Sequence, residues 1–144
     1  NFALLADKMI ETLNCRIIFP GSEKDTGCVK EVISKMKTKN SDCAIDVTGK
    51  TDLKQLCALL KKCSVVIGND TGPLHLAASL GVIPVGLYGP SSPEILSPYH
   101  YKAVCFWKKI ECSPCGIKPT CAENKCMTEI SVEEVFQSVK ELIG

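Results

Sequence analysis

The sequence has no long apolar run, no excess of one charge and few aromatic residues. No apolar stretch reaches the roughly 20 residues of a membrane-spanning helix, and no signal-peptide pattern is present. The 144 residues carry 17 Lys or Arg and 16 Asp or Glu, so a net charge of +1 gives no electrostatic case for binding nucleic acid or a bulk anionic surface. Aromatic residues make up 6% of the chain. Because few basic residues flank Tyr99-His100-Tyr101 and Phe106-Trp107, we expect those aromatic residues to pack rather than to stack on bases.

Two nucleotide-binding patterns are also missing. The chain contains neither a Walker loop nor a Gly-x-Gly-x-x-Gly motif, which disfavours ATPases and nicotinamide enzymes. A chain of this length is one domain by size, and its 45% apolar residues suffice for a core. The first residues, from Asn1 to Ala6, already resemble the interior of an amphipathic helix, so we expect a piece of a larger protein.

What the sequence does contain is an alternation of strand and helix patterns. Apolar residues recur at helical spacing in five segments and short β-branched runs occur in five others. The helical segments are 2–13, 29–36, 53–60, 73–80 and 131–143, and the strands are 15–19, 44–47, 64–67, 84–88 and 103–107. Thr51 is predicted to cap the third helix. The alternation predicts a doubly wound, Rossmann-like α/β fold with a parallel sheet.

Ligands of such folds bind beyond the carboxyl ends of the strands. Four segments are predicted to lie there: 20–25, 48–51, 68–75 and 89–92. The third is the most informative, because Asp70-Thr71-Gly72-Pro73-Leu74-His75 follows a buried strand and opens a helix. Glycine permits a tight turn, and the N–H groups and dipole of a helix start suit a phosphate. The alternative is that Asp70 only caps the helix and His75 is a surface residue.

Two other loops carry weaker signals. Glu23 follows the first strand, where a carboxylate can bind ribose hydroxyls, but a solvated loop glutamate fits the spacing equally well. Gly49-Lys50-Thr51 follows the second strand, and there a turn with a helix cap is favoured over a contact with a phosphate, base or ribose.

The chain has ten cysteines. Six are scattered over apolar faces and are interpreted as reduced, cytosolic thiols. The other four lie in the loop 112–126 with the spacing C-x2-C-x5-C-x4-C. They are Cys112, Cys115, Cys121 and Cys126. Four thiolates can ligate a structural Zn²⁺ tetrahedrally, although the second pair is not spaced like a usual knuckle. A redox pair at Cys112 and Cys115, or free thiols that only pack, are the alternatives.

These motifs together resemble glycosyltransferase family 9, the lipopolysaccharide heptosyltransferases. The resemblance runs from Val65 to Ala78, through Leu87-Tyr88-Gly89-Pro90-Ser91 and Cys112-Ser113-Pro114-Cys115, to Cys126-Met127 and the helix after Ile130. It implies that residues 1–144 are the C-terminal donor-binding domain of a larger two-domain GT-B enzyme.

The resemblance also implies a donor, ADP-L-glycero-β-D-manno-heptose, and roles for particular residues. Asp70 would contact the heptose, Thr71 and Gly72 the diphosphate, Glu23 the ribose and Thr51 the adenosine. His75 matches the family histidine at the same site and would stabilise the leaving group. No cofactor is required beyond the possible structural zinc.

The resemblance further implies that the catalytic base and the lipid-linked oligosaccharide acceptor site lie on an N-terminal domain, so the fragment alone is expected to be inactive. The parent would act in the cytoplasm of a Gram-negative bacterium, peripheral to the inner membrane, without nucleic acid or a transmembrane segment. The alternatives are a family relative with another nucleotide sugar or acceptor, and a non-catalytic, zinc-stabilised binding module.

Overall fold

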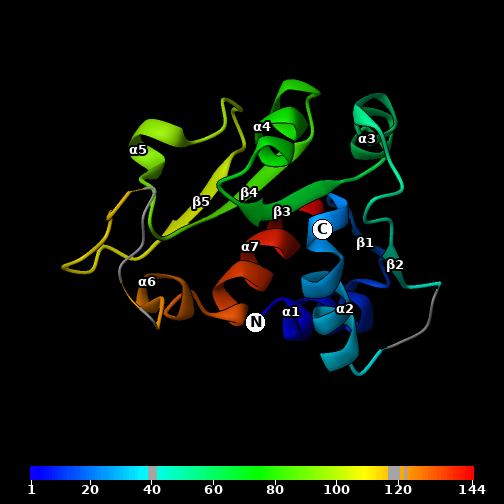
Figure 1. Ribbon diagram of the computed structural model, residues 1–144, viewed down its shortest axis with the longest axis horizontal. Coiled ribbons are helices and arrows are strands. Elements are labelled where there is room, and N and C mark those ends of the chain that lie inside the picture. Colours follow the sequence, from blue (N-terminus) through cyan, green and yellow to red (C-terminus); the bar gives the residue numbers. More distant parts are fainter. Residues whose placement is uncertain (39–41, 117–120, 122) are drawn as a thin grey trace. The chain divides into compact units, whose positions relative to one another are not determined.

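The computed structural model describes residues 1–38, 42–116, 121 and 123–144. They divide into two compact units, Asn1–Leu56 and Cys57–Gly144, with the division inside α3 (Leu53–Leu60). Figure 1 shows the elements of both units. Every predicted strand and helix is present, and every strand pairing is parallel. The predicted α/β class is therefore confirmed, while the assignment of the chain to a single donor-binding domain stays a prediction.

The first unit pairs two short strands. Its elements are α1 (Phe2–Leu13), β1 (Ile17–Phe19), η1 (Glu23–Asp25), α2 (Thr26–Lys35) and β2 (Ala44–Asp46). β1 and β2 run parallel, with Ile17 opposite Ala44. The apolar stripe of α1 supplies most of the core, which contains Ala3, Ala6, Ile10, Met36 and Ala44.

One buried carboxylate ties the two helices of this unit together. Asp7 of α1 is 5% exposed, and its oxygens accept hydrogen bonds of 2.9 Å from the backbone N–H groups of Lys37 and Thr38, just after α2. Burial raises the pKa of the Asp7 carboxyl, but these N–H donors outweigh it and leave the pKa below its usual value.

The second unit is a three-stranded sheet with helices on both faces. Its strands, in the spatial order β3-β4-β5, are β3 (Val65–Asn69), β4 (Ile83–Tyr88) and β5 (Val104–Trp107). α4 (Gly72–Ser79) covers one face and α7 (Val132–Ile143) the other (Figure 1). The short helices α5 (Pro93–Leu96) and α6 (Lys125–Thr128) follow β4 and the cysteine loop. The buried side chains include Leu60, Leu74, Ala77, Val85, Leu87, Tyr88, Val135, Phe136 and Val139.

Two glycines face each other across the middle of this sheet. Gly68 of β3 is the register partner of Gly86 of β4. A Cβ atom on Gly86 would lie 2.5 Å from Cε2 of Tyr88 and 3.1 Å from Cδ2 of Leu74. No heavy atom of the described residues lies within 4 Å of a Cβ placed on Gly68. The missing side chain of Gly86 is therefore what lets the Tyr88 ring and α4 pack onto the strand.

The structure corrects three local predictions. α4 begins at Gly72 rather than at Pro73. α3 is capped by Asp52, whose Oδ1 accepts a 2.7 Å hydrogen bond from the Gln55 N–H, so the prediction that Thr51 caps it is wrong. Asp52 is the capping residue because its carboxylate accepts from the third N–H of the helix. In return, the Gln55 side-chain oxygen accepts from the Asp52 N–H. Predicted packing of the tyrosine pair is wrong as well, because Tyr99 and Tyr101 are 101% and 87% exposed.

Candidate functional site

The carboxyl end of β3 leads directly into the start of α4. Thr71 is the N-cap residue, with extended backbone (φ −145°, ψ 160°). Its hydroxyl donates to the Asn69 carbonyl at 3.2 Å and makes no capping bond to the described part of α4. Pro73 has no N–H and the Leu74 N–H donates to the Thr71 carbonyl at 3.0 Å, so an anion here would meet the Gly72 N–H and the positive end of the helix dipole.

The side chains of Asp70 and His75 lie next to each other at that helix start. His75 Nε2 lies 3.4 Å from Asp70 Oδ1, and the side chains are 44% and 20% exposed. The contact is long for a hydrogen bond and becomes an ion pair when the imidazole is protonated. A carboxylate and an imidazole therefore lie together at the start of α4, as the sequence predicts.

The backbone at this helix start is open. Apart from its chain neighbours and the backbone of α4 itself, no described residue has a heavy atom within 4 Å of a Cβ placed on Gly72. Since glycine adds no side chain, a ligand can come close to the backbone N–H groups here.

A buried tyrosine underlies the site, and the sequence did not single it out. Tyr88 ends β4 with 0% exposure, and its hydroxyl donates to the Leu96 carbonyl at 3.0 Å. Burial, then the nearby Cys105 thiol and the charge of Asp70, raise the pKa of Tyr88 well above its usual value, so the phenol stays neutral. Asn69 of β3 is the register partner of Leu87 of β4, so Asp70 and Tyr88 lie at the same end of these two strands.

Two more of the predicted loops meet in the first unit. Glu23 is exposed in η1, beside a capping box that joins Ser22 and Asp25. Its Cγ lies 2.9 Å from the position of a Cβ on Gly49, which has φ +69°. The Gly49 N–H donates to Gly21 O at 2.9 Å. Glu23 therefore lies against the turn that precedes Thr51, as expected for two loops at the same end of paired parallel strands.

The side chain of Lys50, in the same turn, bonds back to the strand β2. Lys50 Nζ donates to the Asp46 carbonyl at 2.8 Å, which supports a structural role over a contact with a phosphate. The predicted donor-binding residues thus form one group in each unit: Glu23 and Thr51 in the first, and Asp70, Thr71, Gly72 and His75 in the second.

Hydrogen bonds hold the first part of the loop 112–126 against the turn that follows β4. Ser113 Oγ donates to the Gly89 carbonyl at 2.6 Å and accepts from Trp107 Nε1 at 2.9 Å. The Gly116 N–H donates to Pro90 O at 2.8 Å. A Cβ on Gly89 would lie 2.8 Å from the Cys126 sulfur, so this glycine is required for the close packing.

The four clustered cysteines are all free thiols. Burial and then the nearby thiols Cys121, Cys112 and Cys115 raise the pKa of Cys126. Within 1–38, 42–116, 121 and 123–144, however, no group of three His, Cys, Asp or Glu side chains is arranged to hold a metal ion. Residues 117–120 and 122 of the loop lie outside the described residues. The zinc hypothesis stays a prediction.

Comparison with known proteins identifies the class. The model of glycosyltransferase family 9 (heptosyltransferase) matches residues 1–126, and the chain belongs to this family. Among the relatives, lipopolysaccharide heptosyltransferase 2 of Escherichia coli is 33% identical over 103 residues, covering 72% of this chain and 29% of that protein. Lipooligosaccharide heptosyltransferase 2 of Haemophilus influenzae is 31% identical over 147 residues, covering 100% of this chain and 42% of that protein.

Two solved structures share the fold. The E. coli ADP-heptose lipopolysaccharide heptosyltransferase II has a TM-score of 0.84 at 27% identity and matches 99% of this chain and 40% of that one. A family 9 glycosyltransferase of Veillonella parvula has a TM-score of 0.81 at 32% identity, with the same coverage of 99% and 40%. The chain thus spans less than half the length of these proteins. Among its described helices, none is long and apolar enough to cross a membrane.

Proposed function

We propose that this chain is the donor-binding part of an inverting glycosyltransferase that transfers heptose from ADP-L-glycero-β-D-manno-heptose to the inner core of lipopolysaccharide. The observation that carries the proposal is the uncapped start of α4 with Asp70 and His75 beside it. The name of the E. coli structure, an ADP-heptose heptosyltransferase, supports the choice of donor.

In the proposed reaction an acceptor hydroxyl oxygen attacks C1 of the heptose. The bond from C1 to the β-phosphate oxygen breaks, ADP leaves, and a base takes the acceptor proton. We assign that base, and the lipid-linked acceptor, to a further domain of the enzyme in the bacterial cytoplasm. This chain supplies the leaving-group half: helix N–H groups and His75 stabilise the charge that develops on the diphosphate.

The remaining residues are assigned to the rest of the donor. Asp70 would accept hydrogen bonds from heptose hydroxyls, because a carboxylate is an acceptor of sugar O–H groups. Glu23 would bind the ribose and Thr51 the adenosine; the contact of Glu23 with the turn before Thr51 supports placing both on the nucleoside.

Calorimetric titration of the chain with ADP tests the proposal. We expect binding, and a loss of about tenfold in affinity for His75→Ala, as for the removal of one charge-assisted bond.

Gly72→Ala tests the site more directly, because it changes the space at the helix start. Its added methyl group meets no described heavy atom within 4 Å, so it should leave stability unchanged but weaken ADP binding by occupying the ligand's space.

His100→Ala is the matched control, since the chain has two histidines and His100 lies elsewhere, stacked on Tyr101. It should bind ADP like the unchanged chain. Absence of ADP binding at millimolar concentration, or equal affinities for the His75 and His100 variants, would overturn the proposal. Tighter binding of another nucleoside diphosphate would instead replace the donor while keeping the site.

A further inference from the structure

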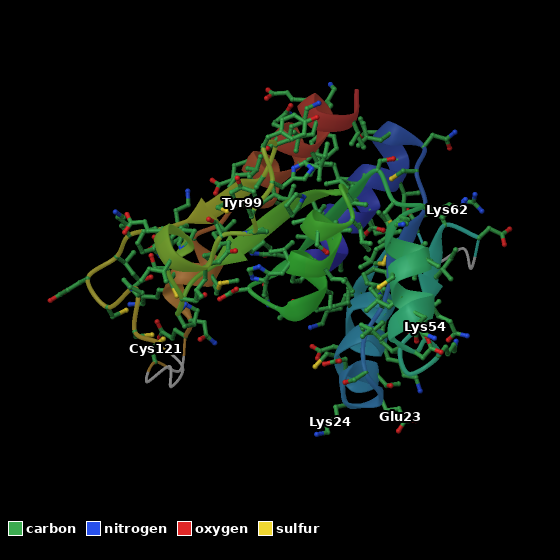
Figure 2. All side chains as sticks on the ribbon, turned by 90° about the horizontal axis from the view of Figure 1, so that it is seen from above. Glu23, Lys24, Lys54, Lys62, Tyr99 and Cys121 are labelled. Carbon is green, nitrogen blue, oxygen red and sulfur yellow. The ribbon has the colours of Figure 1, made fainter. Side chains whose placement is uncertain are left out.

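The turn that follows β4 is not used by the proposed function, although it lies at the same edge of the sheet as Asp70. Asp70 follows β3, and the turn, residues 89–92, follows β4. β3 and β4 are neighbouring parallel strands, and neighbouring strands lie about 4.8 Å apart. The turn is therefore close to the residue that we assign to the donor sugar. Figure 2 shows the side chains of the chain, with Cys121 labelled in the cysteine loop, 112–126.

Hydrogen bonds from the cysteine loop fix two carbonyl groups of this turn. The Ser113 hydroxyl donates to Gly89 O at 2.6 Å, and the Gly116 N–H donates to Pro90 O at 2.8 Å. Ser113 also accepts a bond of 2.9 Å from Trp107, the last residue of β5. Because β4 lies between β3 and β5 in the sheet, the loop meets the turn from the side of β5.

The position of the Pro90 carbonyl decides where the Ser91 N–H points. The peptide bond from Pro90 to Ser91 is trans, and the C=O and N–H of a planar trans peptide point in opposite directions. Because Pro90 O faces the cysteine loop, the Ser91 N–H points away from that loop. It is therefore directed to the side of β4 on which β3 and Asp70 lie.

Ser91 has hydrogen-bonding capacity that the fold does not use. Within the part of the chain that the structure describes, neither its N–H nor its hydroxyl forms a hydrogen bond. The next residue is different, because Ser92 is 8% exposed and its hydroxyl accepts from the Glu94 N–H of α5 at 3.3 Å. Ser91 is half-buried, and polar groups that leave bulk water generally have a protein, water or ligand partner. A ligand at this edge can supply that partner.

We propose that Ser91 binds a hydroxyl group of the donor sugar and so contributes to the choice of that sugar. The Ser91 N–H donates to a sugar oxygen, and the serine hydroxyl can donate or accept. The Asp70 carboxylate can only accept, so the two residues offer complementary partners to hydroxyl groups of one sugar. A phosphate is a poorer partner for Ser91, because the nearby carboxylate repels a second negative charge. This inference rests on the proposed function, which supplies the nucleotide sugar.

Calorimetric titration of the chain with two ligands tests the inference. The probes are ADP, which lacks the sugar, and ADP-L-glycero-β-D-manno-heptose. Ser91→Ala should bind ADP like the unchanged chain but bind the nucleotide sugar about three- to tenfold more weakly, as for the loss of one neutral hydrogen bond. Its free energy of unfolding in urea should stay the same, because the hydroxyl has no partner among the described residues.

Two serines of the same segment serve as controls. Ser97→Ala removes an exposed hydroxyl directly after α5 and should leave both affinities unchanged. Ser92→Ala removes the cap of α5 and should destabilise the fold, unlike Ser91→Ala. Equal losses for ADP and the nucleotide sugar in Ser91→Ala, no loss for either, or a loss of stability would overturn this inference while the proposed function stands. Absence of ADP binding by the unchanged chain would overturn the proposed function and this inference with it.

Discussion

The facing glycines of the three-stranded sheet allow a matched pair of stability measurements. Gly86→Ala should destabilise the second unit, whereas Gly68→Ala, on its register partner, should not. The added Cβ at 86 would lie 2.5 Å from Cε2 and 3.2 Å from Cζ of Tyr88. Relieving such contacts requires the ring to move by about 1 Å.

The ring cannot move cheaply, because Tyr88 is 0% exposed and its hydroxyl is held by Leu96 O at 3.0 Å. Overpacking of a core costs about 1–3 kcal/mol, and replacing glycine by alanine in a strand returns about 0.5–1 kcal/mol. We expect a net loss of up to about 2.5 kcal/mol for Gly86→Ala. With nothing within 4 Å at Gly68, only the gain of about 0.5–1 kcal/mol remains there.

Urea unfolding followed by tryptophan fluorescence measures the difference. The sole tryptophan, Trp107, ends β5, so its emission reports on the second unit. The two variants should differ by about 1–3 kcal/mol in free energy of unfolding at the same m-value, because the gain from replacing glycine is common to both. Equal midpoints for both variants would show that the Tyr88 ring does not depend on the missing Cβ, and the packing argument would be wrong.

Three further predictions concern the carboxylate of α1 and the cysteines. Asp7→Asn should cost about 1–3 kcal/mol. Since the folded pKa of Asp7 lies below its usual value, the stabilisation is present above about pH 4 and lost as the pH falls through that folded pKa; urea midpoints against pH check this, with Glu11→Gln, an exposed position on the same helix, as control. Alkylation followed by mass spectrometry should modify exposed Cys28 and Cys112 first and buried Cys126 last. The zinc hypothesis predicts about one zinc per chain in protein purified without chelator.

Each of these three predictions has a result that would contradict it. A pH profile of Asp7→Asn parallel to that of the unchanged chain would show that the carboxylate does not hold the end of α2. Early alkylation of Cys126 would contradict its burial against Gly89. Zinc well below one per chain would leave the two alternatives, a redox pair at Cys112 and Cys115 or thiols that only pack.

Sequence patterns predicted the elements because each follows from local chemistry. The stripe of α1 and the β-branched runs of the strands are short-range signals, and α1 has the predicted bounds Phe2–Leu13. The helix start at Asp70 to His75 was predictable because strand, glycine and proline are consecutive in the chain.

What the sequence could not supply depends on residues far apart in it. Nothing near Gly86 indicates that Tyr88 and Leu74 occupy its missing side chain, and nothing near Gly89 indicates the sulfur of Cys126. Thr51 and Asp52 are both good capping residues, so only the helix start at Leu53 decides between them. The tyrosine pair was expected to pack because few basic residues flank it in the sequence, and its exposure depends on where α5 and β5 lie.

The contact between Gly89 and the α6 segment has an evolutionary consequence. A Cβ at position 89 would meet the sulfur atoms of Met127 at 2.5 Å and Cys126 at 2.8 Å. Substitutions at these positions should therefore be inherited together: family members with a side chain at 89 should carry smaller residues at 126 or 127. Retention of the cysteine across homologues would then reflect its small volume opposite a glycine, and a count of invariant thiols would overstate the number that have a chemical role.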